Sequence, residues 1–292
     1  PSSSFSRPFN YLRKMACSWG WDWGPWLTTA GVWRPAALEA WTYGRLGDIR
    51  PHVTVDDDNE GRIDVEIDAE IDAQIDGPLD PRLRITLFDP NGDALTSTTT
   101  AVTPTAGTHV ASRISIDVGT IERWWPHSHG GQPLYRMRIE LIDRRGTVHA
   151  ERELRVGFRT IELDTAADAT GSKFTFIVNG RPIFVRGANW IPEDVFVSRV
   201  GPDRYRARIA DAIDAHVDLL RVWGGGIYED DEFYAACDEL GVLVWQDFAF
   251  ACAAYPEQLL AAEVEAEARD NVSRLMHHAS LALWNGNNEN LW

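Results

Sequence analysis

From about residue 172 to its end, the chain alternates β-prone and helix-forming segments, and this alternation restricts the fold more than any other feature. The strand-like runs are apolar and lie at residues 182–185, 217–223, 242–248 and 280–284. Helical patterns lie between them, at about 202–213, 229–240 and 256–278. Strands that are buried on both faces and separated by helices form a parallel sheet. The segment therefore predicts the first half of a (β/α)₈ barrel, with the chain ending after the fourth strand.

Local turn and cap signals support these boundaries. Asn179-Gly180 lies between two apolar runs and predicts a hairpin with a type I′ turn. Pro202 is placed to open a helix, the acidic residues from Glu229 to Asp231 to begin the next one, and Gly241 to end it.

Residues 48–162 follow a period of two instead. Residues 63–72 alternate strictly between apolar and acidic side chains, which predicts a half-buried strand with its carboxylates in water rather than a cation site. Further strands are predicted at residues 83–88, 113–118, 135–142 and 154–161. Roughly seven short strands in this length are typical of an immunoglobulin-like sandwich.

Residues 1–47 are rich in tryptophan, glycine and proline, which predicts short strands and loops at the end of another β-sandwich. The predicted fold is thus multidomain, β plus α/β, with domains at 1–47, 48–162 and 163–292. We expect the chain to be part of a larger protein, because it begins inside one predicted domain and ends inside another.

Composition excludes several classes of function. The 28 Lys and Arg residues against 44 Asp and Glu residues give a net charge of −16, which disfavours nucleic acid and anionic membranes as partners. No apolar run reaches the roughly 20 residues of a spanning helix. The cysteines are isolated, so neither a disulfide framework nor a zinc knuckle is expected, and a reducing, cytoplasmic compartment is slightly favoured.

Polar and aromatic residues follow the predicted strands, where barrel enzymes place their reactive groups. They include Asn189, Trp223, Asp247 and Glu289. Amides bond hydroxyl groups and indoles stack on sugar rings, so this edge suits a neutral polyhydroxylated ligand. Glu289 is the candidate general acid, and glycosidic cleavage needs a second carboxylate about 5–5.5 Å away if configuration is retained. Asp247 and Glu229 are the other acids near this edge, and neither is an obvious partner.

Other motifs carry weaker signals. The three glycines 224–226 lack a nucleotide-binding pattern, and His127 and His129 lack further metal ligands nearby in sequence. His277-His278 is interpreted as a core or helix-end feature, and Cys252 has no adjacent histidine that would make it a nucleophile. We therefore expect no metal and no cofactor.

The chain resembles the β-mannosidases of glycoside hydrolase family 2 over almost its whole length. The motifs that carry the resemblance are SWGWDWGPWLTTAGVWRP, WWPHSHGGQPLYR, VGFRTIEL, RGANWIPEDVF, LLRVWGGGIYEDDEFYAACDELGVLVWQDFAFACAAYP and LALWNGNNE. VGFRTIEL is shared by the wider family, whereas GWDWGP and RVWGGGIYE point more narrowly to β-mannosidases. The resemblance implies a retaining exo-hydrolase that removes terminal β-D-mannose, from either a mannan-derived oligosaccharide or an N-glycan core.

The resemblance also assigns roles to residues. Glu289 matches the general acid/base, and Asn288 matches the residue that bonds the sugar 2-hydroxyl. Trp223 would line the subsite of the terminal sugar, while Trp21 and Asp22 would close the pocket from the N-terminal segment. Asn189 is assigned to substrate binding by its strand position alone.

One part of the family pattern is missing. The nucleophile of the family is a glutamate after the seventh barrel strand, beyond residue 292, so we expect this chain alone to be inactive. A β-galactosidase, β-glucuronidase or endo-β-mannosidase of the same family remains an alternative, as does a non-catalytic carbohydrate-binding protein.

Overall fold

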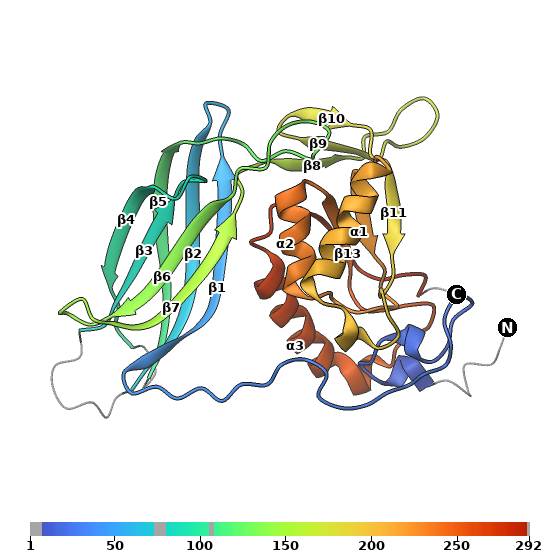
Figure 1. The fold of residues 1–292 in the computed structure, drawn as a ribbon, viewed down its shortest axis with the longest axis horizontal. Coiled ribbons are helices and arrows are strands. Elements are labelled where there is room, and N and C mark those ends of the chain that lie inside the picture. Colours follow the sequence, from blue (N-terminus) through green and yellow to red (C-terminus); the bar gives the residue numbers. More distant parts are fainter. Residues whose placement is uncertain (1–7, 73–79, 105–107, 291–292) are drawn as a thin grey trace.

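Two facing antiparallel sheets occupy the region from Gly44 to Val156 (Figure 1). The computed structural model describes residues 8–72, 80–104 and 108–290. One sheet has the order β1-β2-β5 and the other the order β4-β3-β6-β7. Their strands are β1 (Gly44–Val55), β2 (Glu60–Ile71), β3 (Arg82–Phe88), β4 (Ala94–Ala101), β5 (His109–Thr120), β6 (Tyr135–Ile142) and β7 (Val148–Val156). The seven strands confirm the predicted sandwich.

The alternating segment forms β2, as predicted. Its apolar side chains, such as Ile63 and Ile67, are at most 1% exposed and face the core between the sheets. Its acidic side chains lie on the other face, where the Arg50 guanidinium bonds Asp68 at 2.8 Å and Glu66 at 3.3 Å. Cross-strand pairs of this kind explain the acidic run without a bound cation.

The prediction of one strand over 154–161 is wrong. β7 ends at Val156, and β8 (Ile161–Asp164) belongs to a different sheet. Gly157 lies where the chain leaves the sandwich and packs so closely that a Cβ there would stand 2.6 Å from the Cβ of Ala279. β4 was not predicted either, because it is a half-exposed edge strand without a continuous apolar face.

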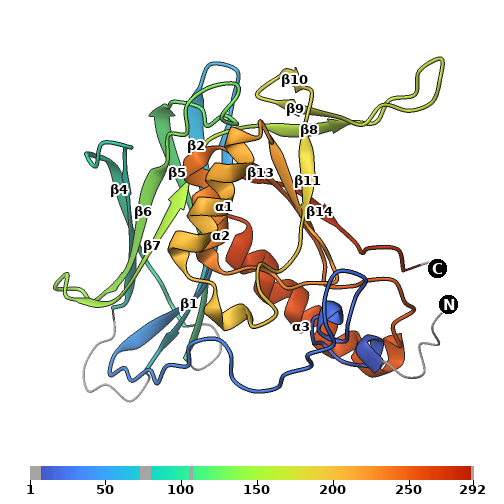
Figure 2. The same ribbon diagram turned by 45° about the vertical axis from the view of Figure 1, so that its right-hand side comes forward.

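The C-terminal part is an α/β unit. Its elements are β11 (Gly187–Trp190), α1 (Pro202–Asp214), β12 (Leu219–Val222), α2 (Asp231–Leu240), β13 (Leu243–Asp247), α3 (Glu257–Leu275) and β14 (Leu281–Asn285). The strands form one parallel sheet in sequence order, with a helix in each connection. Helices α1 to α3 lie on the side of this sheet that faces the sandwich (Figures 1 and 2).

Helix ends follow the predicted signals. Pro202 is in the first turn of α1, and the Asp230 carboxylate caps α2 by accepting the Glu232 N–H at 3.2 Å. Gly241 ends α2 in the left-handed conformation, with φ of 77°.

The predicted hairpin forms, with φ of 50° at Asn179 and 75° at Gly180. Its strands β9 (Thr175–Val178) and β10 (Arg181–Ile183) join β8 in a separate three-stranded sheet beside the start of β11. The first parallel strand is therefore residues 187–190. The sequence had predicted it at residues 182–185 and had placed residues 187–190 after its end.

Only part of the parallel sheet is buried on both faces. β12 and β13 are mostly buried, whereas residues 187–189 of β11 are exposed and most of β14 is half-buried. The helices cover one face, and an apolar cleft of about 430 Å³ lined by Phe174, Phe184 and Trp245 remains beside the strands.

Residues 8–43 contain no strand in the part of the chain that the structure describes, contrary to prediction. They hold two short 3₁₀ turns, η2 (Pro8–Tyr11) and η3 (Ala16–Ser18), and one isolated bridge between Trp19 and Trp26. Gly20, Gly24 and Pro25 interrupt any longer ladder. The segment runs from the α/β unit to β1 (Figure 1). Within the described residues, no helix combines the length and apolar character needed to cross a bilayer.

Gly157→Ala tests the packing between the sandwich and the α/β unit. The added methyl group would overlap Ala279 and press on Trp124, so we expect a loss of about 1–3 kcal/mol in the free energy of unfolding. Urea denaturation measures it. Gly201→Ala is the matched control, because no atom lies within 4 Å of its Cβ position, and equal stability of the two variants would contradict the close packing.

Candidate functional site

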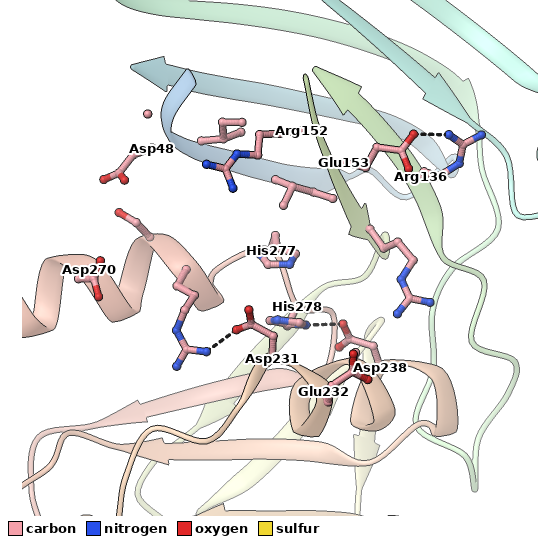
Figure 3. Close-up of a pocket in the computed structure, with 17 residues that line it drawn as sticks. Asp48, Arg136, Arg152, Glu153, Asp231, Glu232, Asp238, Asp270, His277 and His278 are labelled. Atoms are coloured by element: carbon pink, nitrogen blue, oxygen red, sulfur yellow. Dashed lines mark hydrogen bonds and ion pairs between the residues drawn. The ribbon is translucent and has the colours of Figure 1, made fainter. Parts of the chain in front are cut away.

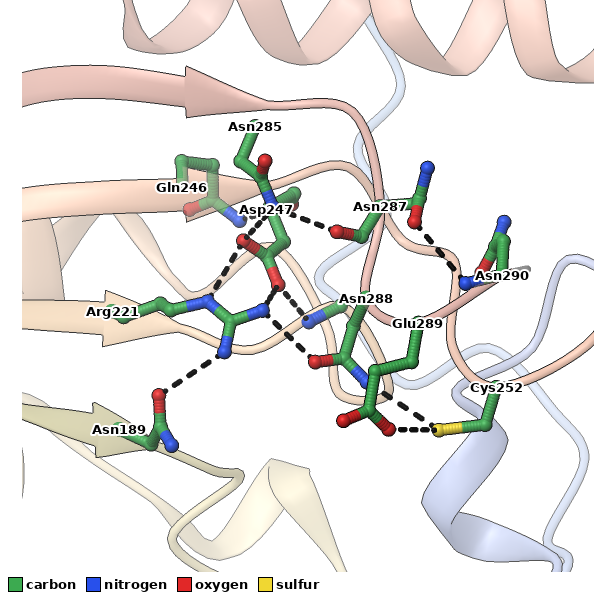
Figure 4. A network of polar contacts seen from close by, with 11 residues as sticks. Asn189, Arg221, Gln246, Asp247, Cys252, Asn285, Asn287, Asn288, Glu289 and Asn290 are labelled. Carbon is green, nitrogen blue, oxygen red and sulfur yellow. Dashed lines mark hydrogen bonds and ion pairs between the residues drawn. The ribbon is translucent and has the colours of Figure 1, made fainter. Parts of the chain in front are cut away.

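The carboxyl ends of the parallel strands meet at one edge of the sheet (Figure 4). The strand register pairs Asn189 with Arg221 and Asp247 with Asn285, so polar side chains from separate segments face one another. The chain after β14 adds Asn288 and places Glu289 at the rim of the same cluster.

An ion pair between the half-buried Arg221 and the buried Asp247 lies at the centre of this cluster. Arg221 Nη2 lies 2.6 Å from Asp247 Oδ2, and Arg221 Nε lies 3.1 Å from Asp247 Oδ1. The Asp247 side chain is fully buried and also accepts the Gly224 N–H and the Asn285 amide. With four donors on two oxygens, this carboxylate is a structural anchor and has no free lone pair facing a substrate.

The same guanidinium orients two amides. Arg221 Nη2 donates to Asn288 Oδ1 at 2.9 Å, and Arg221 Nη1 donates to Asn189 Oδ1 at 3.3 Å. A guanidinium only donates, so each amide must turn its oxygen toward Arg221. The NH₂ group of Asn288 is therefore directed away from the ion pair.

Glu289 lies at the exposed side of the cluster. Its Oε2 accepts from Cys252 Sγ at 3.3 Å, the one hydrogen bond of its side chain within the described residues. Glu289 and Cys252 both have positive φ, 55° and 50°, which costs roughly 1–2 kcal/mol for each residue. A parallel bridge between Ala251 and Asn288 holds the two segments together.

Glu229 is not at this edge. It is 2% exposed and accepts the Trp190 indole N–H at 2.9 Å and the Tyr205 hydroxyl at 2.7 Å. Burial raises the pKa of Glu229, partly offset by those two hydrogen bonds. Its role is to tie β11 to α1 beneath the sheet edge.

The N-terminal segment covers the edge beside Trp223. Trp21 and Trp23 contact the Trp223 indole edge-on. Their ring centroids lie 4.9 and 5.8 Å, respectively, from the centroid of Trp223. The Trp223 ring folds over Gly225, where a Cβ would stand 1.9 Å from the indole. Gly225 thus serves close packing rather than phosphate binding, and its carbonyl accepts the Cys17 N–H.

Arg13 fastens this segment to the α/β unit. Its guanidinium makes two hydrogen bonds to the Glu267 carboxylate, at 2.6 and 2.8 Å, and stacks on Phe250. Asp22, next to Trp21, is exposed, and no hydrogen bond among the described residues engages its carboxylate.

The histidine motifs are structural. Ser128 Oγ bonds both His129 Nδ1 and Asp218 Oδ1 at 2.7 Å, so the serine lies between the histidine and the aspartate. The two bonds fix the conformation of this loop. Burial lowers the pKa of His277 to about 3, and the adjacent His278 bonds Asp238 at 2.6 Å. The described residues contain no cluster of metal-ligating type.

These two histidines border a cavity of about 650 Å³ between the sandwich and helices α2 and α3 (Figure 3). Its charged walls pair with one another, for example Arg136 with Glu153 and Arg274 with Asp231. Because both signs of charge line the cavity, its walls do not point to one class of charged ligand.

Arg221 and Cys252 are the site residues that the sequence analysis missed. A signal existed for Arg221, because a lone cation in the apolar strand Leu219–Val222 needs a buried anion, and Asp247 ends the next strand. No local signal places Cys252 beside Glu289, since 36 residues separate them and a loop conformation makes the contact.

A double-mutant cycle tests the anchor. Arg221→Met leaves the buried Asp247 carboxylate without its cation and should cost about 3–5 kcal/mol of unfolding free energy. Asp247→Asn added to Arg221→Met should recover part of that loss, because no buried charge remains. Strictly additive losses in urea denaturation would show that the two side chains do not depend on each other.

Comparison with known protein families identifies two matching regions. Residues 45–159 match the model "Glycosyl hydrolases family 2", and residues 2–34 match "Glycosyl hydrolase 2 galactose-binding domain-like". Among curated relatives, β-mannosidase of Capra hircus is 38% identical over 286 residues, covering 96% of this chain and 32% of the relative. β-Mannosidase B of Aspergillus clavatus is 39% identical over 279 residues, with shares of 95% and 32%.

Comparison with solved structures also finds a β-mannosidase. The crystal structure of β-D-mannosidase from Dictyoglomus thermophilum matches with a TM-score of 0.87 and 38% identity, covering 95% of this chain and 33% of that one. A Bacteroides uniformis β-glucuronidase has a TM-score of 0.73 at 18% identity, covering 86% and 30%, which shows a shared fold alone. The chain spans about a third of the length of the relatives it matches.

Proposed function

We propose that this chain belongs to glycosyl hydrolases family 2 and that it carries part of the active site of an exo-acting β-mannosidase. The homologous β-mannosidases support the substrate class. The observation that carries the chemistry is the sheet edge just after β14, where Arg221, paired with the buried Asp247, holds Asn288, and Cys252 contacts Glu289.

The proposed domains are 1–47, 48–162 and 163–292, with boundaries that fall inside β1 and β8, and the last domain is the first half of a (β/α)₈ barrel. Its support is the parallel order of four strands, with every connecting helix on one side of the sheet. A closing barrel has its helices outside and its side chains packed inside, and the half-open face of β11 and β14 agrees with that arrangement.

Glu289 is the proposed general acid/base of a retaining mechanism. Its carboxyl group gives a proton to the glycosidic oxygen while a carboxylate nucleophile bonds to the anomeric carbon and the carbon–oxygen bond to the leaving group breaks. Water then attacks the anomeric carbon as the bond from that carbon to the nucleophile carboxylate breaks, and Glu289 takes a proton from the water; mannose is released with its configuration retained. The exposed carboxyl at the end of β14 is open to both the leaving group and water.

The nucleophile is proposed to come from a part of the protein outside this chain. Asp247 is buried with all its acceptor sites engaged, and Glu229 is buried against Trp190 and Tyr205. Neither carboxylate is free to attack a sugar, so we expect residues 1–292 alone to be inactive.

Asn288 is the proposed partner of the mannose 2-hydroxyl. Because Arg221 holds its oxygen and Cys252 Sγ lies 3.4 Å from its Nδ2, the second N–H of the NH₂ group is the part that remains to donate to a ligand. Asn189, held by the same guanidinium, is proposed to contact the substrate beside it. A contact to the 2-hydroxyl that strengthens as charge develops at the anomeric carbon would favour the transition state over the ground state.

Trp21, Asp22 and Trp223 are proposed to close the pocket around the terminal sugar. Trp21 lies against Trp223, and the unengaged Asp22 carboxylate can accept bonds from sugar hydroxyls. A pocket closed on one side accepts only a chain end, which would give exo action.

The charge pattern favours a neutral sugar over a glucuronide. A glucuronidase needs a free cation for the substrate carboxylate. Arg221 is committed to Asp247, and Arg186 bonds Asp218 near the opposite, amino end of the strands.

Glu289→Ala in the complete protein tests the acid/base role. We expect kcat/KM to fall by about 10²–10⁴-fold for phenyl β-mannoside, whose leaving group needs protonation, and much less for the dinitrophenyl substrate. Steady-state hydrolysis of both substrates measures it. Equal losses of kcat/KM for the two substrates would show that Glu289 does not transfer the proton to the leaving group.

Asp22→Asn tests the closure of the pocket. Replacing one carboxylate oxygen by an NH₂ group removes an acceptor, so kcat/KM for β-mannosides should fall at least about tenfold, as expected for a charge-assisted hydrogen bond. Asp58→Asn, at an exposed turn of the sandwich, is the control and should leave kcat/KM unchanged. An unchanged kcat/KM in Asp22→Asn would place that carboxylate outside the pocket.

A further inference from the structure

A chain of hydrogen bonds leads from the buried ion pair to the exposed carboxyl (Figure 4). Arg221 donates to Asn288 Oδ1 at 2.9 Å, and Asn288 Nδ2 lies 3.4 Å from Cys252 Sγ. Cys252 Sγ in turn donates to Glu289 Oε2 at 3.3 Å. Each step has one donor and one acceptor, and all donors point the same way, from the core to Glu289.

We propose that Cys252 is a positioning residue for the acid/base: its thiol holds the Glu289 carboxyl in line with the leaving group and links it to the Arg221–Asp247 anchor. The inference rests on the proposed function of Glu289. No cofactor or redox change is involved, because the thiol acts only as a hydrogen-bond donor and acceptor.

The backbone is arranged for this contact. Cys252 N–H donates to the Asn288 carbonyl at 2.8 Å, and Asn288 N–H donates to the Phe250 carbonyl at 3.0 Å. These bonds hold the two segments side by side, Cys252 and Glu289 both have left-handed backbone conformations, and their side chains point toward each other (Figure 4). Strained non-glycine residues persist where the surrounding structure fixes them, and here two occur in contact.

The thiol is suited to donate rather than to react. Burial, together with the hydrogen bond to Glu289, raises the pKa of Cys252 to about 11. The side chain therefore keeps its proton at neutral pH, and a protonated thiol is both a donor to the carboxylate and a poor nucleophile. Glu289 is otherwise exposed, so without Cys252 its side chain would be free to take other rotamers.

The test compares Cys252→Ala, Cys252→Ser and Glu289→Gln in the complete protein, with phenyl and dinitrophenyl β-mannosides as substrates. If Cys252 positions the acid, Cys252→Ala should lower kcat/KM about tenfold for the phenyl substrate and less than about twofold for the dinitrophenyl substrate. Cys252→Ser keeps a donor and should recover a substantial part of the phenyl activity. If Cys252 had only a structural role, Cys252→Ala would lower kcat/KM equally for both substrates.

Cys17→Ala is the matched control. Cys17 is a buried thiol of the same apolar cluster, but within the described residues its thiol makes no hydrogen bond to Glu289, so any loss should be the same for both substrates. If Glu289→Gln discriminates between the substrates and Cys252→Ala does not, the positioning role is wrong while the proposed function stands. If Glu289→Gln does not discriminate either, both are wrong.

Discussion

The ion pair of Arg221 with the buried Asp247 is the interaction on which the sheet edge depends. A carboxylate with no exposed surface is costly to bury unless it is paired and hydrogen-bonded, and Asp247 receives four donors. Because the pair joins β12 to the end of β13 and reaches Asn288 after β14, it fixes three separate segments in one geometry. These donors offset the cost of burying the charge, and they make the sheet edge rigid where the polar residues converge.

The three acids near the predicted strand ends have three different environments. Asp247 is buried with a cation, Glu229 is buried with neutral donors, and Glu289 is exposed with one thiol contact. Environment, not residue type, decides which carboxyl can exchange protons with a substrate. The arrangement therefore singles out Glu289 as the candidate for acid/base chemistry and assigns the other two to the framework.

The regular elements were predictable because their signals are local. Pro202 and Gly241 mark helix ends through backbone geometry, and strict alternation marks β2. The strand assigned to 154–161 failed because the turn at Gly157 is imposed by contact with Ala279, which local pattern does not show. The candidate residues at the strand ends followed from parallel-sheet geometry, whereas contacts made by loop conformation, such as that of Cys252 with Glu289, required the structure.

The proposed function unites these features: a rigid polar edge, an exposed acid and an indole-lined cover. Its most direct test is the hydrolysis, by the complete protein that contains this chain, of aryl β-mannoside, β-galactoside, β-glucoside and β-glucuronide under the same conditions. The account predicts that kcat/KM for the β-mannoside exceeds the others by at least about a hundredfold, because the held amide of Asn288 and the Asp22 carboxylate select hydroxyl positions. Preference for the β-galactoside or β-glucuronide would contradict the proposed specificity, and absence of all hydrolysis would contradict the proposed chemistry.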